Sequence, residues 1–211
     1  MTKNKRLLRR KAVRILSNLY AVLIYSIFYI PVAVMILFSF NDAKRNYYWQ
    51  GFTTEWYGKL FSFANTDLWD ALLYSLIIAV LATLISVTIG VLGGIGLKKF
   101  EFRTKRFINM MIYVPIIVPE IVLAVAMLII FMTVGIRLGM GTILIGHCTF
   151  CIPYAVVTIK GRITGDSETL QEASMDLGAN RFQTFWRVTV PSIMPGILSS
   201  AFLAFTLSID D

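Results

Sequence analysis

Charged residues are scarce in this sequence. Asp, Glu, Lys and Arg make up 15% of its 211 residues, against about 25% in an average soluble domain. Hydrophobic residues make up 57%, and the mean hydropathy is +0.71. A chain with so little charge is neither a typical soluble enzyme nor an intrinsically disordered protein. The composition therefore predicts an integral membrane protein.

Acidic residues are scarcer than basic ones. The chain has 12 Asp and Glu against 20 Lys and Arg, a formal net charge of +8. In a soluble protein this excess would indicate binding to nucleic acid or another acidic surface. In so apolar a chain it indicates basic cytoplasmic loops. We therefore expect membrane lipid, and no nucleic acid, among the partners.

Cysteine and histidine are also rare. The chain has one histidine, His147, and two cysteines, Cys148 and Cys151, which lie in an apolar run. Two cysteines exclude a disulfide framework. The i, i+3 spacing places both on one helix face, but a structural zinc site needs four ligands, and no second Cys/His cluster exists. We predict that the chain binds no metal and that the cysteines pack as small apolar residues.

A nucleotide-binding loop is absent as well. The cluster of Gly90, Gly93, Gly94 and Gly96 lies in an apolar run and lacks the Gly-Lys-Ser/Thr of a Walker A motif. Gly90 and Gly94 form a GxxxG pair, which allows two helices to approach closely. We interpret this pair as packing within a helical bundle rather than as a dedicated dimer interface.

Long apolar runs predict the membrane topology, because about 20 apolar residues cross a bilayer as a helix. After a basic tail at 1–14, we expect a transmembrane domain over 15–211, with spans at 15–40, 71–97, 107–134, 141–159 and an incomplete, truncated fifth at 195–211. The first apolar run is too long for a signal peptide and has no small-residue cleavage site, so we expect it to be retained. The predicted fold class is an all-α polytopic membrane bundle.

The connecting segments predict the orientation. Sixteen of the 20 Lys and Arg fall in the N-terminal tail, in 98–106 and in 160–190. Since basic residues collect on the cytoplasmic side, these three segments are predicted to be cytoplasmic. The outer connection 41–70 contains aromatic residues that suit a membrane–water boundary, namely Tyr47, Tyr48, Trp49, Trp56, Tyr57 and Trp69.

The cytoplasmic segment 160–190 is internally patterned. Thr169–Glu172 fits a capping box, which predicts a short helix running to about Leu177. Gly178 suits a left-handed helix end, and a second helix is predicted over 181–188, ended by Pro191.

Leu170, Ala173 and Leu177 would form an apolar stripe on the first of these helices. Such a stripe needs a surface to cover it. The pattern by itself leaves two options open: the membrane surface or the chain's own bundle, and a partner protein.

The run Glu172–Gly178, followed after nine residues by Val188–Pro191, resembles the EAA loop of the membrane subunits of bacterial ABC importers. Ser174, Val188 and Val190 are mild departures from the family pattern. The resemblance implies a type I (MetI-like) permease fold and docking of this loop in a cleft of a separate ATPase subunit. It implies that ATP is hydrolysed by those subunits and that this chain is not an enzyme.

Carried over from that family, Glu172, Ala173 and Gly178 would couple ATP hydrolysis to movement of the permease. An intramembrane enzyme using His147, Cys148 and Glu120 is the alternative from another class. It needs a nucleophile and a base within reach, and nothing in the sequence places these residues together.

Glu120 is a charged residue near the middle of the third predicted span. Such groups are costly in the membrane and mark solute pathways by default, although protonation or pairing with a base would also explain this one. Pro115 and Pro119 cannot donate helical hydrogen bonds. Tyr113, seven residues earlier, is predicted to share a helix face with Glu120. Together these groups would form an acceptor-rich patch suited to an ammonium group.

Asp210 and Asp211, next to Ser208, add two carboxylates at the end of the fifth segment, where they mark either a pathway or a membrane boundary. The runs Trp49–Tyr57 and Phe205–Asp211 resemble the PotC-type spermidine/putrescine permeases. The resemblance implies a polyamine pathway past Glu120, Ser208, Asp210 and Asp211, assisted by the aromatic rings of Trp56 and Tyr113.

The resemblance also implies the partners of the chain: a second permease, two ATPase subunits and an extracytoplasmic polyamine-binding protein, in a bacterial inner membrane. An ABC permease for a metal ion, an anion or another small organic solute is the alternative. An anion pathway would need Lys, Arg or helix N-termini at depth, and the basic residues lie in the connections instead.

Overall fold

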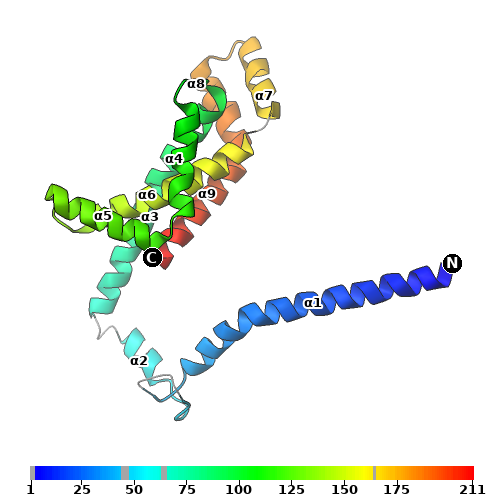
Figure 1. Cartoon of the computed structure of the whole chain (residues 1–211), viewed down its shortest axis with the longest axis vertical. Helices are drawn as coiled ribbons and strands as arrows, with labels where there is room; N and C mark the ends of the chain where they lie inside the picture. The colour runs from blue at the N-terminus through cyan, green and yellow to red at the C-terminus, as the bar shows by residue number, and fades with distance from the viewer. Residues whose placement is uncertain (1–2, 44–47, 63–65, 164) are drawn as a thin grey trace. The chain divides into compact units, whose positions relative to one another are not determined.

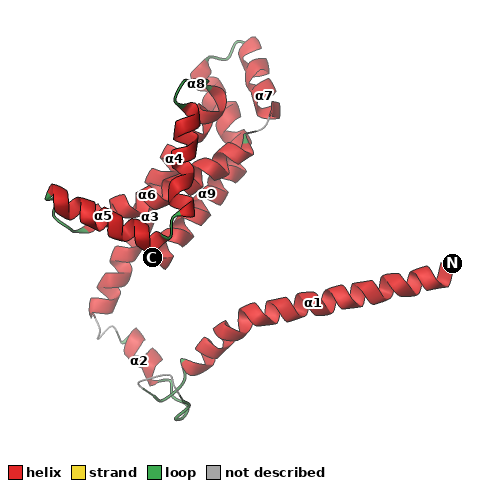
Figure 2. Ribbon diagram, in the orientation of Figure 1, coloured by secondary structure: helices red, strands yellow, loops and turns green. Residues whose placement is uncertain are grey.

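The computed structural model describes residues 3–43, 48–62, 66–163 and 165–211. This part of the chain is almost entirely helical (Figures 1 and 2), and its β pairing is limited to one isolated bridge between Asn41 and Phe52. Among the described residues, four helices are long and apolar enough to cross a membrane, or five spans if one bent pair is counted. The predicted all-α membrane fold class is confirmed.

The chain divides into two compact units, Met1–Trp69 and Asp70–Asp211. The first contains α1 (Lys3–Phe38) and α2 (Glu55–Phe61). The turn between them is organised by Asn41, whose side chain donates to Tyr48 O and accepts from Gln50 N, each at 2.8 Å. Among the aromatic residues predicted for the membrane boundary, Tyr47 lies outside the described residues.

The second unit contains the remaining helices. They are α3 (Thr66–Lys99, which begins at the end of the first unit), α4 (Lys105–Ile117), α5 (Glu120–Val134), α6 (Met140–Arg162), α7 (Gly165–Asp176), α8 (Arg181–Thr184), the π-helical turn η1 (Phe185–Thr189) and α9 (Val190–Asp210). Its core lies between α6 and α9, where Cys151, Ile159, Ile193 and Ala204 are fully buried. As predicted, Cys151 packs as a core residue, against Ala204 and Phe150.

Helix α3 approaches α6 closely through its glycines. A Cβ atom at Gly90 would lie 2.7 Å from the Cβ of Ala155, and one at Gly94 would lie 3.2 Å from Cγ2 of Ile159. Both distances are shorter than ordinary van der Waals contact, so side chains here would force the helices apart. The prediction that the GxxxG pair packs within the bundle is confirmed.

We expect Gly90→Leu to destabilise the bundle by about 1–3 kcal/mol or more, the usual effect of overpacking a filled core. Gly96→Leu is the matched control on the same helix, because a Cβ at Gly96 meets nothing within 4 Å. Thermal unfolding in detergent, together with the amount of protein in the membrane, measures the difference. Equal stability of the two variants would contradict the close contact between α3 and α6.

The third predicted span is broken. Helices α4 and α5 meet at an angle of 109°, so the segment predicted as one span at 107–134 consists of two helices. Val118 is extended (φ −71°, ψ 131°), because a residue before proline avoids the helical region. Pro119 (φ −55°, ψ 132°) then precedes the first residue of α5, Glu120. Apolar composition predicted a membrane segment here, but not this steric break.

The last helix is longer than expected. The predicted helix over 181–188 was to end at Pro191, yet α8, η1 and α9 follow one another without a break and form a 30-residue apolar segment. Pro191 is the second residue of α9 and directly follows the π-helical turn. The Val190 N–H bonds to Phe185 O in the π-helical pattern. The prediction that Pro191 ends a helix is therefore wrong.

Candidate functional site

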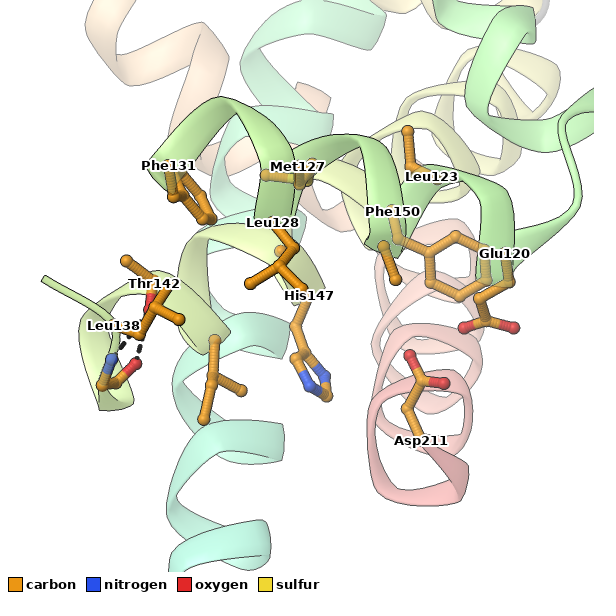
Figure 3. Close-up of a pocket in the computed structure, with 14 residues that line it drawn as sticks. Glu120, Leu123, Met127, Leu128, Phe131, Leu138, Thr142, His147, Phe150 and Asp211 are labelled. Carbon is orange, nitrogen blue, oxygen red and sulfur yellow. Dashed lines mark hydrogen bonds between the residues drawn. The ribbon is translucent and has the colours of Figure 1, made fainter. Parts of the chain in front are cut away.

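A cavity of about 430 Å³ in the second unit is lined by residues of α5, α6 and the chain end at Asp211 (Figure 3). Its walls are mainly apolar, with Leu123, Met127, Phe131 and Phe150 among the lining residues. The titratable side chains that line it are Glu120, His147 and Asp211. A few polar groups at one side of an apolar cavity are typical of a small-molecule site.

Glu120 and Asp211 bring two carboxyl groups together at this cavity. They come from α5 and from the residue after α9, and Figure 3 shows their carboxyl groups facing the same region. Glu120 is half-buried and Asp211 exposed. As the first residue of α5, Glu120 also lies where a negative charge stabilises a helix N-terminus. The lining residues include no Lys or Arg, so the charge of this part of the cavity favours a cation.

His147 lines the cavity, although the sequence analysis did not predict it as a pathway residue. Its Nδ1 lies 2.8 Å from Ser208 Oγ, which joins α6 to α9. Ser208, predicted as a pathway residue, is only 3% exposed, whereas the half-buried ring of His147 lines the cavity. The signal available in the sequence was a lone histidine in an apolar run, which we considered only as a metal ligand or a catalytic group.

Two other predicted pathway residues do not line this cavity. Tyr113 lies on α4 and is 45% exposed, while Glu120 begins α5. The prediction that these two residues share one helix face is wrong, because the break at Pro119 places them on helices inclined at 109°. Asp210 is an exposed residue at the end of α9 and is not among the lining residues.

Trp56, predicted to assist the pathway, belongs to the first unit. Its indole N–H donates to Asn41 O at 2.9 Å, which fixes the ring against the turn after α1. Lys59 Nζ lies 4.8 Å from the centre of the Trp56 ring and 2.7 Å from a carboxyl oxygen of Glu55. The ring therefore already faces one ammonium group, and Lys59 lowers the pKa of the Glu55 carboxyl.

The predicted coupling residues lie on α7 and the turn after it. Glu172 and Ala173 are exposed on α7. Gly178 has φ +88°, and Gly178 N bonds to Met175 O at 2.9 Å while Ala179 N bonds to Ser174 O at 3.1 Å. These two bonds form a Schellman motif, so the predicted left-handed helix end is confirmed. The predicted capping box is wrong, because α7 begins at Gly165 and places Thr169 inside the helix.

Helix α7 lies beside α8 at one end of the second unit (Figure 1). Ser174 Oγ is 3.2 Å from Thr184 Oγ1 of α8, and Lys99 Nζ at the end of α3 donates to Gln171 Oε1 at 3.3 Å. The apolar side chains of Leu170 and Leu177 are 54% and 90% exposed. The described part of the bundle therefore leaves both side chains exposed. A partner protein or the membrane surface would have to cover them.

Comparison with known proteins gives consistent matches. Residues 86–211 match the family described as binding-protein-dependent transport system inner membrane component. The spermidine/putrescine transport system permease protein PotC of Escherichia coli (strain K12) is 38% identical over 198 residues, covering 94% of this chain and 74% of that protein.

Two further relatives agree. PotC of Haemophilus influenzae (strain ATCC 51907 / DSM 11121 / KW20 / Rd) is 36% identical over 196 residues, covering 93% of this chain and 76% of that protein. The putrescine transport system permease protein PotI of E. coli (strain K12) is 34% identical over 194 residues, covering 89% of this chain and 68% of that protein. This chain therefore belongs to the family of binding-protein-dependent transport system inner membrane components and has its MetI-like permease fold.

Proposed function

We propose that this chain is a permease subunit of an ATP-driven importer of polyamines such as spermidine and putrescine. The observation that carries the proposal is the approach of Glu120 and Asp211 at one side of an otherwise apolar cavity without lining Lys or Arg. A polyamine alternates ammonium groups with methylene chains. Carboxylates accept hydrogen bonds from the ammonium groups, and apolar walls cover the methylenes.

The relatives support the choice of solute, since their names assign them to spermidine, putrescine or both. Ser208 and Asp210 are proposed as further pathway residues beside Asp211. Trp56 and Tyr113, which do not line the cavity, are proposed as aromatic contacts elsewhere along the route, because an aromatic face attracts an ammonium group.

The proposed assembly contains a second permease, two ATPase subunits and an extracytoplasmic polyamine-binding protein. The exposed Glu172 and Ala173, with Gly178 ending α7, form the proposed contact with an ATPase subunit. The ATPase subunits would bind and hydrolyse ATP, and this chain would need no cofactor of its own. The apolar residues exposed beside them on α7 fit a helix that docks into a groove of a partner.

We propose that the N-terminus, 98–106 and 160–190 face the cytoplasm. The hydrogen bond between Lys99 and Gln171 supports this orientation, because it brings two of these basic segments together at one end of the bundle. The four Lys and Arg of the other connections then lie outside.

The test is the uptake of labelled spermidine into cells that lack their own polyamine importers and express the assembled transporter. We expect saturable uptake, inhibited by unlabelled putrescine and unaffected by phosphate. ATP hydrolysis by an assembled complex that takes up no polyamine would contradict the proposal. It would favour the alternative, a permease for a metal ion, an anion or another small organic solute.

A further inference from the structure

His147 lies at the cavity between two kinds of neighbour. On one side its Nδ1 is 2.8 Å from Ser208 Oγ of α9. On the other, its ring lines the same cavity as Glu120 and Asp211 (Figure 3). It is the single histidine of the chain, so every effect of an imidazole in this protein traces to this position.

The hydrogen bond to Ser208 uses one ring nitrogen of His147 and leaves the other ring nitrogen available. A neutral imidazole has one donor and one acceptor nitrogen. When Nδ1–H donates to Ser208 Oγ, Nε2 carries the lone pair and serves as an acceptor. An ammonium group has donors only, and it therefore complements this arrangement together with the two carboxylates.

Ser208 is suited to hold the ring in this way. Its side chain is buried, at 3% exposure. Ser208 belongs to α9 and lies three positions before Asp211, the residue after that helix. The contact joins residues 61 positions apart in the chain. Packing fixes the hydroxyl group, and its hydrogen bond then fixes the orientation of the imidazole. The partner of one histidine nitrogen thereby sets whether the other nitrogen is a donor or an acceptor.

We propose that His147 is a specificity-determining residue of the solute pathway, oriented by Ser208 and accepting a hydrogen bond from a solute ammonium group through Nε2. This inference rests on the proposed function and adds to it a third, uncharged acceptor. A site with two carboxylates alone would accept any compact cation. A directional acceptor at the same cavity favours solutes with N–H groups over quaternary ammonium ions, which cannot donate.

Two substitutions separate this role from a purely structural one. The amide of His147→Asn reaches the position of Nδ1 and can keep the bond to Ser208, while it places nothing at Nε2. The longer amide of His147→Gln reaches the position of Nε2 and loses the bond to Ser208. The measurement is spermidine uptake by the assembled transporter, with KM and Vmax determined separately and the amount of complex quantified.

We expect His147→Asn to raise KM about tenfold, the effect of losing one hydrogen bond to a charged group, with normal assembly and nearly unchanged Vmax. His147→Gln should raise KM less than His147→Asn. The unchanged transporter should discriminate against N,N-permethylated spermidine when this compound competes with labelled spermidine for uptake. This discrimination should weaken in His147→Asn. Cys148→Ser, at the next position and outside the cavity lining, should behave as the unchanged protein.

A different pattern overturns the inference. If His147 only ties α6 to α9, His147→Asn will keep normal KM, and His147→Gln will lower the amount of assembled complex. A normal KM in His147→Asn, in a transporter whose unchanged form takes up spermidine, rejects the role of His147 and leaves the proposed function standing. Absence of spermidine uptake by the unchanged transporter rejects the proposed function itself.

Discussion

Uptake is expected to be abolished by Glu172→Lys, although the variant should fold and reach the membrane in normal amounts. Glu172 is exposed on α7, and substitutions at exposed positions usually change stability by less than about 0.5 kcal/mol. The proposed ATPase contact is more sensitive, because opposing like charges across an interface costs several kcal/mol. We expect the ATPase subunits to dissociate from the permease, or to hydrolyse ATP without transport.

The control for charge reversal is Glu101→Lys. Glu101 is also an exposed glutamate, in a segment proposed to face the cytoplasm. Its side chain is 86% accessible, and its ion pair with Lys105 is a surface contact of little energetic value. Uptake and co-purification of the ATPase subunits should be normal in this variant. Full transport by Glu172→Lys would show that α7 does not carry the coupling contact.

Glu120→Gln is expected to lower spermidine uptake at limiting concentration by about 10- to 100-fold. The glutamine amide keeps the shape of the side chain and removes its charge. A hydrogen bond to a charged group contributes about 1.5–3 kcal/mol, and a factor of ten corresponds to about 1.4 kcal/mol. Because Asp211 lines the same part of the cavity, Glu120→Gln and Asp211→Asn should be non-additive when combined.

A structural role of Glu120 makes a different prediction. As the first residue of α5, Glu120 also stabilises a helix N-terminus, an effect of about 0.3–1 kcal/mol. If this were its whole contribution, Glu120→Gln would lower thermal stability and leave KM unchanged. Glu55→Gln, which removes an exposed carboxylate from the first turn of α2, is the matched control and should leave uptake of spermidine normal.

The break between α4 and α5 could not be predicted from the hydropathy pattern. Hydropathy reports which residues prefer lipid, and it identified 107–134 as a membrane segment. It does not report backbone sterics at an X-Pro bond. Pro115 lies inside α4 without ending it, whereas Val118 and Pro119 separate two helices. Two prolines four residues apart thus had different outcomes.

The amino-acid sequence was sufficient for the features that depend on local composition. The long apolar runs determined that the chain is a helical membrane protein. Gly178 determined the left-handed end of α7, because glycine adopts a positive φ without steric cost. The spacing of Gly90 and Gly94 determined a helix face without side chains, on which another helix can pack.

The tertiary structure decided which distant residues meet. Glu120, His147 and Asp211 line one cavity, although they come from α5, α6 and the residue after α9. Helix α6 packs against α9, which brings Ser208 to His147, and α5 bends away from α4 at Pro119. Sequence patterns describe spacing along one helix. They contain no distance between helices, so the contact of His147 with Ser208 could not be predicted, and the face shared by Tyr113 and Glu120 was predicted wrongly.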